Sequence, residues 1–187
     1  MRITGGQRKG RILASPKGLE TRPTSDQVRE AIFNIIGQDL RGVKVLDLFA
    51  GTGSLGLETL SRGASCAVFI DNSRQSVKLI KKNLALCGYE DAGVVLRRDL
   101  RKGIRRIQPV VKGVFDLVFI DPPYGKDFIS LILSELSTTA ILSDKSRVVA
   151  ESSKSEKLPF FVGMLEMIDG RSYGYTKVSF YAYEAEK

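Results

Sequence analysis

The chain has 187 residues, carries 29 lysines and arginines against 21 acidic residues, and contains no histidine. The absence of histidine excludes Ser-His-Asp and Cys-His nucleophilic schemes and histidine metal sites. Cys66 and Cys87 lack metal-ligand or redox spacing, no run is long enough to span a membrane, and no signal-peptide core follows Met1, so we expect a cytoplasmic protein without metal or membrane contact. We also expect it to be a monomer.

Residues 1–24 are predicted to be a basic N-terminal extension. Glu20 is its only acid and several glycines interrupt it, so a short β-hairpin or ordered arm is expected instead of a helix. Such an arm can lay its cations along an RNA backbone, whereas a solvated tail is the alternative. The residues expected to contact RNA are Arg2, Arg8, Lys9, Arg11, Arg22, Thr24 and, from the following helix, Arg29.

The predicted second domain, residues 25–187, begins with a helix. Thr24 and Gln27 form a capping box, an apolar face follows from Val28 to Ile36, and Gly37 ends the pattern. Arg29 lies one turn into this helix, where it could reach a bound cofactor, RNA or solvent.

A short apolar run, Val45–Leu48, is predicted to be a buried strand followed by a glycine-rich turn and a helix. Gly51, Gly53 and Gly56 satisfy G-x-G-x-x-G, which is typical of nucleotide-binding turns. The spacing alone fits a dinucleotide or S-adenosylmethionine, and a ligand-free packing turn is the third alternative. Asp47 favours S-adenosylmethionine, because a carboxylate there opposes a pyrophosphate and suits an ammonium or sulfonium group.

The next strand, Cys66–Ile70, ends at Asp71, at the distance expected of an acid that holds a ribose. A helix capped by Ser73 and a third strand, Val94–Leu96, follow it. Asp99 comes just after that strand, and a helix N-cap is its alternative role. A basic cluster from Arg97 to Arg106 is interpreted first as a solvated face and second as an RNA contact.

A fourth strand, Phe115–Ile120, leads directly into Asp121-Pro122-Pro123-Tyr124. Two prolines fix the path of the chain as it leaves the strand, and at the carboxyl end of a parallel strand this loop should face the same crevice as the Gly51 turn. Asp121 and the Pro122 carbonyl can accept hydrogen bonds from an exocyclic amine, and the Tyr124 ring can stack on a base. A simple proline turn is the alternative.

The remaining chain contains an amphipathic helix from Phe128, a strand at Arg147–Glu151, and a final strand pair, Phe161–Ile168 and Tyr175–Tyr183, joined at Asp169-Gly170. Strands that alternate with helices indicate βαβ crossovers and a mainly parallel sheet. The fold class expected is therefore α/β.

Asp-Pro-Pro-Tyr after a strand, preceded by Asp-x-Phe-x-Gly-x-Gly, resembles the class I amino-methyltransferases. The segments Arg2–Gly6, Arg22–Thr24, Val28–Asn34 and Arg171–Lys177 are similar to the RsmD-type bacterial 16S rRNA guanine-N2 methyltransferases, so the resemblance spans nearly the whole chain.

This resemblance implies a Rossmann-like fold with a seven-stranded sheet, helices on both faces and an N-terminal β-hairpin. It implies methyl transfer from S-adenosylmethionine to a guanine N2 amine of 16S rRNA, with the assembled small subunit as substrate. The implied catalytic residues are Asp121, Pro122, Pro123 and Tyr124. The implied cofactor residues are Asp47, Phe49, Ala50, Gly51, Thr52, Gly53, Asp71, Asn72, Asp99 and Leu100.

Three other functions remain open from the residues. A DNA adenine or cytosine amino-methyltransferase would use the same Asp121–Tyr124 corner, although the chain lacks an evident base-reading domain. A nicotinamide-dependent oxidoreductase fits the glycines but leaves Asp47 and the Asp121 corner unexplained. A non-catalytic RNA-binding module would bind RNA without methyl incorporation.

Overall fold

The computed structural model describes residues 1–16, 26–105, 107, 113–123 and 128–184. The chain forms two compact units, Met1–Arg98 and Asp99–Lys187. The boundary that the sequence predicts at residue 24 stays a prediction. The described part of the N-terminal extension belongs to the first unit.

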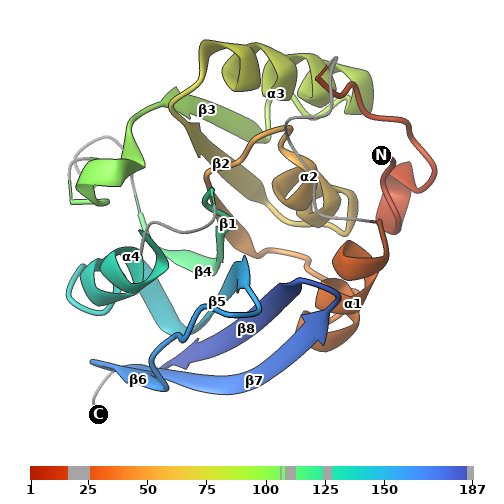
Figure 1. Ribbon diagram of the computed structural model, residues 1–187. Coiled ribbons are helices and arrows are strands. Elements are labelled where there is room, and N and C mark those ends of the chain that lie inside the picture. Colours follow the sequence, from red (N-terminus) through yellow and green to blue (C-terminus); the bar gives the residue numbers. More distant parts are fainter. Residues whose placement is uncertain (17–25, 106, 108–112, 124–127, 185–187) are drawn as a thin grey trace. The chain divides into compact units, whose positions relative to one another are not determined.

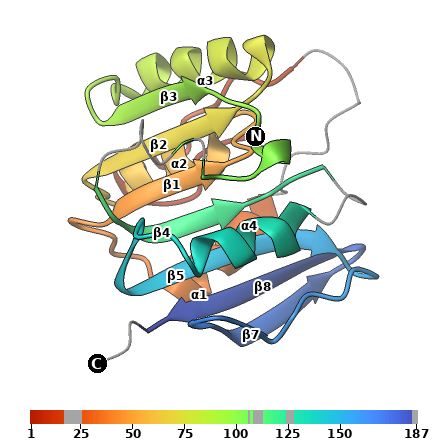
Figure 2. The ribbon, with the colours of Figure 1, turned by 90° about the vertical axis from the view of Figure 1, so that its left-hand side faces the viewer.

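Three parallel strands form the framework of the first unit, in the order β3-β2-β1. The inner residues of β1 and β2 are buried and, apart from Asp47, apolar, as expected for covered strands, whereas β3 is only partly buried. Leu46 lies opposite Val68, which lies opposite Val94. The strands, side by side in Figure 2, are β1 (Lys44–Leu48), β2 (Cys66–Asp71) and β3 (Gly93–Arg97).

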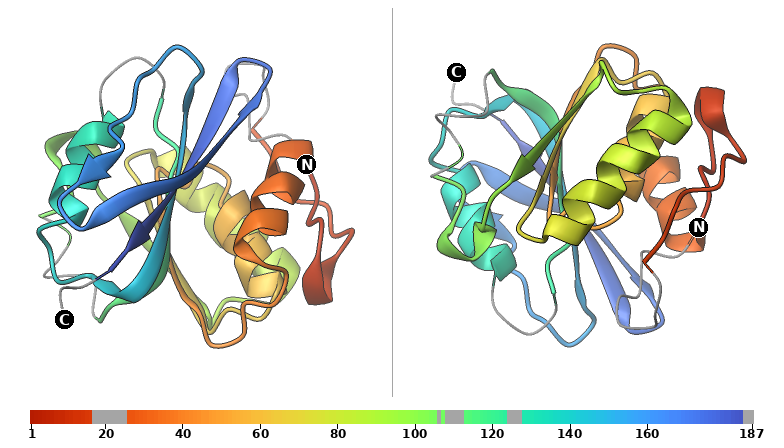
Figure 3. Two further views of the ribbon diagram at one scale, coloured as in Figure 1. Left: turned by 90° about the horizontal axis from the view of Figure 1, so that it is seen from below. Right: turned by 90° about the horizontal axis from the view of Figure 1, so that it is seen from above.

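Three helices lie on one side of these strands, as Figure 3 shows. They are α1 (Asp26–Ile36), α2 (Ser54–Ser61) and α3 (Arg74–Cys87). Helix α2 packs on β1 and β2, and α3 packs on β2 and β3. The Ser73 hydroxyl caps α3 by accepting from the Gln75 and Ser76 N–H groups, and Gly88 ends it in the left-handed conformation. The helix and its Ser73 cap are those that the sequence predicts.

The N-terminal extension runs out to a short 3₁₀ turn, η1 (Gly6–Arg8), and returns antiparallel to itself. Arg2 and Ile12 form an isolated antiparallel bridge, and the Ile3 and Gly10 backbones are hydrogen-bonded across it. The predicted hairpin is thus a narrow antiparallel loop with one bridge, which we call the arm (residues 1–16).

The second unit contains η2 (Leu100–Lys102), β4 (Phe115–Ile120), α4 (Phe128–Leu136), β5 (Leu142–Ser153), β6 (Phe161–Val162), β7 (Leu165–Tyr173) and β8 (Thr176–Tyr183). Its strands follow the order β4-β5-β8-β7-β6, and Figure 1 labels its strands and α4. β4 is parallel to β5, and the other pairs are antiparallel. The structure therefore describes eight strands, one more than predicted, because a two-residue strand precedes β7.

The predicted turn at Asp169-Gly170 is wrong. β7 continues through both residues, and Gly170 lies opposite Ser179 in β8. The turn comes at Gly174, which has a φ of +62° and is the residue that can adopt this conformation without a side-chain clash. The Asp169 region instead carries a register shift in the β7–β8 ladder.

Candidate functional site

The turn after β1 has a backbone that only certain residues accept. Phe49, Gly51 and Gly53 have φ values of +61°, +55° and +76°. The Gly53 N–H donates to the Ala50 carbonyl at 2.6 Å, and Gly53 is the N-cap of α2. A glycine is favoured at two of these positions because a Cβ atom is strained there, and Phe49 is a strained non-glycine residue of the kind that clusters at functional sites.

Two glycines of this motif have different surroundings. A Cβ atom on Gly56 would overlap the Phe69 ring of β2, so this glycine lets α2 pack closely on the strand. Among the described residues, a Cβ atom on Gly51 would have only the Phe49 carbonyl oxygen within 4 Å. Gly56 thus serves packing, whereas Gly51 leaves open space beside the turn.

Asp47 lies on β1 with its side chain 1% exposed. Its Oδ2 accepts the Gly56 N–H at 3.0 Å, which connects the strand to α2. Burial raises the pKa of Asp47 to about 7; the Gly56 hydrogen bond opposes this rise and the charge of Asp71 adds to it. A nearby cation would reverse this effect by stabilising the ionised form.

Asp71, at the end of β2, fastens two loops together. Its Oδ2 accepts the Gly51 N–H at 2.9 Å, and its Oδ1 accepts the Ser73 N–H at 2.8 Å. The carboxylate is half-buried, and each oxygen keeps a second lone pair that can accept from a ribose hydroxyl. Asn72 beside it is exposed. The first unit therefore brings together the predicted cofactor residues from Asp47 to Gly53 with Asp71 and Asn72.

The predicted adenine neighbours, Asp99 and Leu100, begin the second unit. Asp99 caps η2 by accepting the Arg101 N–H at 3.0 Å, which is the alternative role expected from the sequence. The Arg101 side chain also hydrogen-bonds to it, and this contact lowers the pKa of Asp99 to about 2. Leu100 is buried.

The Asp-Pro-Pro segment follows β4 directly, as predicted. Asp121 is half-buried, Pro122 is buried and Pro123 is exposed. Tyr124 lies outside the described residues, as do Arg22 and Thr24 of the predicted RNA contacts.

Arg2, Arg8, Lys9 and Arg11 are exposed on the arm, as an RNA-contacting role requires. Arg29 is different, because its side chain is fully buried. It donates to the Arg2 carbonyl and pairs with Asp26 at 2.7 Å and with Glu58 at 3.4 Å. A guanidinium that is buried against these protein groups has no exposed surface to offer to RNA, so we remove Arg29 from the proposed RNA contacts.

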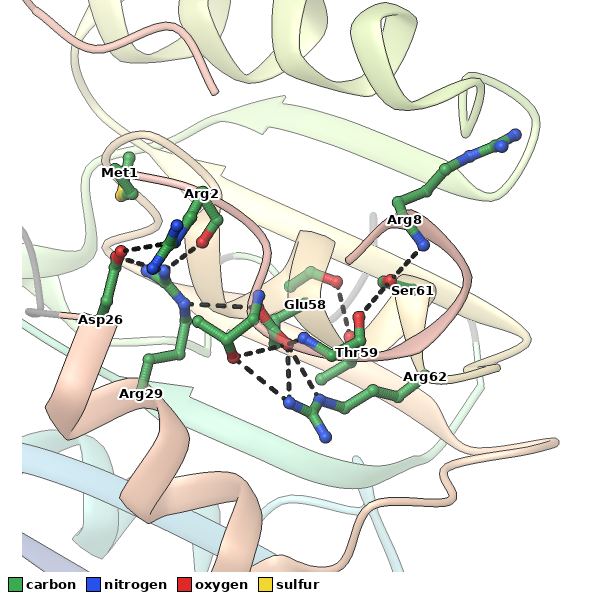
Figure 4. Close-up of polar contacts among 12 residues, drawn as sticks. Met1, Arg2, Arg8, Asp26, Arg29, Glu58, Thr59, Ser61 and Arg62 are labelled. Atoms are coloured by element: carbon green, nitrogen blue, oxygen red, sulfur yellow. Dashed lines mark hydrogen bonds and ion pairs between the residues drawn. The ribbon is translucent and has the colours of Figure 1, made fainter. Parts of the chain in front are cut away.

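Sequence reasoning missed the centre of this cluster, the fully buried carboxylate of Glu58 on α2. Figure 4 shows the arm and two arginines converging on it. It accepts from the Thr4 N–H at 2.8 Å and hydroxyl at 2.9 Å, and from the Gly5 N–H at 2.7 Å. Arg62, one turn along α2, pairs with it at 2.8 Å.

The same cluster explains the Gly5-Gly6 pair in the arm. A Cβ atom on Gly5 would overlap the Arg62 guanidinium, and one on Gly6 would overlap the Ser61 carbonyl. The Ser61 hydroxyl donates to the Gly5 carbonyl at 2.6 Å and accepts the Arg8 N–H at 2.9 Å. The arm is therefore fixed to α2 through backbone groups.

The described residues form neither a metal-binding cluster nor a membrane-spanning helix. Among the described residues, no group of histidine, cysteine and acidic side chains could hold a metal ion. No helix in the described part of the chain is both long and apolar enough to cross a membrane.

The whole chain is similar to proteins of one family. The family model Cons_hypoth95, described as conserved hypothetical protein 95, matches residues 1–182. YlbH of Bacillus subtilis, named provisionally as an rRNA methyltransferase, is 36% identical over 97% of this chain and 98% of its own. Ribosomal RNA small subunit methyltransferase D of Escherichia coli is 35% identical, over 85% of this chain and 78% of its own.

A solved structure agrees with these relatives. The Escherichia coli protein yhhF, described provisionally as a methyltransferase, has a TM-score of 0.85 and 32% identity, and the match covers 100% of this chain and 99% of that one. The fold is therefore the Rossmann-like α/β fold that the sequence predicts. The strand–turn–helix motif, the Asp-Pro-Pro segment and these matches show that the chain belongs to the Cons_hypoth95 family, the RsmD-type family that its motifs resemble.

Proposed function

We propose that this protein transfers a methyl group from S-adenosylmethionine to the exocyclic N2 amine of a guanine in 16S rRNA of the small ribosomal subunit. The observation that supports this most is the turn after β1. There Asp47, which is buried, and Asp71, which accepts the Gly51 N–H, lie beside a position at Gly51 that is open among the described residues. The relatives' names support an rRNA substrate, and the guanine N2 amine is the finer part of the proposal.

The residues of the first unit fit S-adenosylmethionine chemically. Asp71 would hold the ribose hydroxyls, the backbone of Phe49 to Gly53 would border the ligand, and Asp47 would stabilise its positive charge. Asp99 and Leu100 would border the adenine. When bound, the cofactor supplies a methyl group activated by a positively charged sulfur.

The Asp121–Tyr124 segment would prepare the acceptor. A guanine N2 lone pair is delocalised into the ring, so the amine is a poor nucleophile. Asp121 and the Pro122 carbonyl would accept hydrogen bonds from its two N–H groups and turn the lone pair towards the methyl group, and the one proton that the amine loses on methylation would pass to solvent. Pro123 would fix the path of the chain, and Tyr124 would hold the base plane. Most of the acceleration would then come from positioning and electrostatics, without an imidazole base.

The test uses purified small ribosomal subunits lacking the modification, naked 16S rRNA, and duplex DNA, each incubated with methyl-labelled S-adenosylmethionine. We expect N2-methylguanosine, identified by nucleoside mass spectrometry, from the RNA substrates. Asp121→Ala should reduce transfer at least about 100-fold and leave cofactor binding, measured by calorimetry, unchanged.

Asp116→Asn is the matched control, because Asp116 lies on β4, the strand that leads into Asp121, and accepts a hydrogen bond from the Ser143 hydroxyl at 2.6 Å. It should keep its activity. Labelled methyladenine or methylcytosine in DNA would overturn the proposed substrate, and full turnover by Asp121→Ala would overturn the assigned role of Asp121.

A further inference from the structure

Helix α3 carries cations but no acidic residue. Arg74, Lys78, Lys81 and Lys82 are all exposed on it. Arg74, Lys78 and Lys82 follow one another at four-residue spacing, so they form a ridge in which successive side chains are about 6 Å apart along the axis. We call these three residues the α3 ridge.

The charge pattern of the ridge is unfavourable for the helix itself. Like charges at four-residue spacing on a helix repel each other. Arg74 is the first residue of the helix, where the helix dipole favours anions, and the first turn has no acid and the last turn no base. Helix stability therefore gives no reason for this arrangement, whereas a polyanion bound along the ridge would offset the repulsion.

The arm is held against the same helix. The Asn83 side chain accepts the Ala14 N–H at 2.8 Å and donates to the Ala14 carbonyl at 3.1 Å. Arg8 donates from Nε to the Cys87 carbonyl at 2.8 Å, and its guanidinium carbon is 5.8 Å from the centre of the Tyr89 ring. Figure 1 shows the arm reaching α3 from η1. Its exposed cations are thereby fixed beside the helix.

We infer that the α3 ridge is part of the RNA-binding surface and contacts the phosphate backbone together with Arg8, Lys9 and Arg11 of the arm. The ligand class follows from charge: neither the described arm nor α3 contains an acid, and the first acids after the helix are Glu90 and Asp91, beyond Gly88. A surface with this charge binds polyanions by releasing their counterions. The inference rests on the proposed function for the identity of the polyanion and adds a second RNA-contacting element to it.

The experiment compares two double substitutions with the same change in net charge. Lys78→Glu/Lys82→Glu reverses two charges of the ridge, and Lys154→Glu/Lys157→Glu reverses two exposed lysines of the second unit. Binding of the full-length proteins to small ribosomal subunits and to naked 16S rRNA is measured over a series of salt concentrations. Binding of S-adenosylmethionine and thermal unfolding are measured in parallel.

We expect the ridge variant to bind RNA at least about tenfold more weakly than wild type at 0.1 M salt, with the slope of log affinity against log salt reduced by about 2. The control variant should change affinity less than about twofold. Because the ridge charges repel, Lys78→Gln/Lys82→Gln should also weaken RNA binding while its unfolding temperature stays equal or rises.

Equal losses in the two charge-reversal variants would overturn the inference, because net charge alone would then explain them. Unchanged RNA binding in the ridge variants would overturn it as well, even if the wild-type protein methylates rRNA. Failure of the proposed function is distinguishable, because it would appear as wild-type protein that binds rRNA without incorporating methyl groups.

Discussion

The first unit contains two buried carboxylates, Asp47 and Glu58, with opposite surroundings. Glu58 is paired with Arg29 and Arg62 inside the protein and also accepts hydrogen bonds from the arm. Asp47 accepts one hydrogen bond, from the Gly56 backbone, and its pKa rises to about 7 because it is buried. A carboxylate with its cations already present is suited to structure, whereas one that favours an additional cation is suited to binding a ligand.

The largest loss of stability is expected for substitution of Glu58, whose charge is already paired inside the protein. Glu58→Ala leaves the buried Arg62 without its carboxylate, leaves Arg29 paired with Asp26 alone, and removes the acceptor for Thr4 and Gly5. Breaking a buried ion pair in this way should cost about 3–5 kcal/mol of the free energy of unfolding, measured by urea denaturation. Glu30→Ala on the exposed face of α1 is the control and should change stability by less than about 0.5 kcal/mol. A loss below about 1 kcal/mol in Glu58→Ala would show that the cluster is not required for folding.

Asp47 should give a pH dependence of stability that Glu58→Ala does not remove. Its pKa is about 7 in the folded protein and about 4 in an unfolded chain, so between these values the folded state binds more protons. This contribution is fully present below pH 4 and is lost as the pH rises through 7, for a total of up to roughly 4 kcal/mol. Denaturation of Asp47→Asn between pH 5 and 8 should lack this decline, because the amide still accepts from Gly56 and does not titrate. An identical decline in both proteins would assign it to other groups.

Gly56 and Gly51 differ in a similar way, because Gly56 allows close packing and Gly51 borders the proposed cofactor site. Gly56→Ala should cost about 1–3 kcal/mol of stability, because the new methyl group overlaps the Phe69 ring. Gly51→Ala meets open space and pays only backbone strain of about 1 kcal/mol, but its methyl group enters the proposed cofactor site. In thermal unfolding Gly56→Ala should therefore lose more stability than Gly51→Ala, and in cofactor calorimetry Gly51→Ala should lose more affinity than Gly56→Ala. The same ranking in both measurements would contradict this division of roles.

The position of Asp47 at a strand–turn–helix motif was predictable, because the residues that indicate the motif are close together in the sequence. A strand, a glycine turn and the start of a helix lie within the twelve residues 45–56, and Asp71 follows at the end of the next strand. The Asp-Pro-Pro segment was likewise placed correctly at the end of β4, because prolines interrupt a strand wherever they occur.

The Glu58 side was not predicted because its partners are distant in sequence. Arg29 is 29 residues before Glu58 and Thr4 is 54 residues before it, and a single arginine on an amphipathic helix gives no sign of burial. One signal was available: Leu55, Leu57 and Leu60 surround Glu58, and Arg62 follows it at four-residue spacing, which indicates a charged pair on a helix that is apolar on more than one face. The β7–β8 turn was misplaced because Asp169-Gly170 has the composition of a turn but lies within a paired strand.

The smallest expected effect separates Asp47 from the other acid assigned to the cofactor, Asp99. If Asp47 ionises when the sulfonium binds, cofactor affinity should fall about tenfold for each pH unit below 7. Asp99 is already ionised over this range, because the Arg101 hydrogen bond lowers its pKa to about 2. Asp99→Asn should therefore weaken binding only a few-fold and leave the shape of the pH profile intact, whereas Asp47→Asn should flatten it. Calorimetry at several pH values, in buffers of different ionisation enthalpy, counts the protons released on binding. Proton release that disappears in Asp99→Asn and persists in Asp47→Asn would reverse the two assignments. Asp99, which already pairs with Arg101, would then be the acid that responds to the cofactor, and Asp47 would not be paired by its ligand.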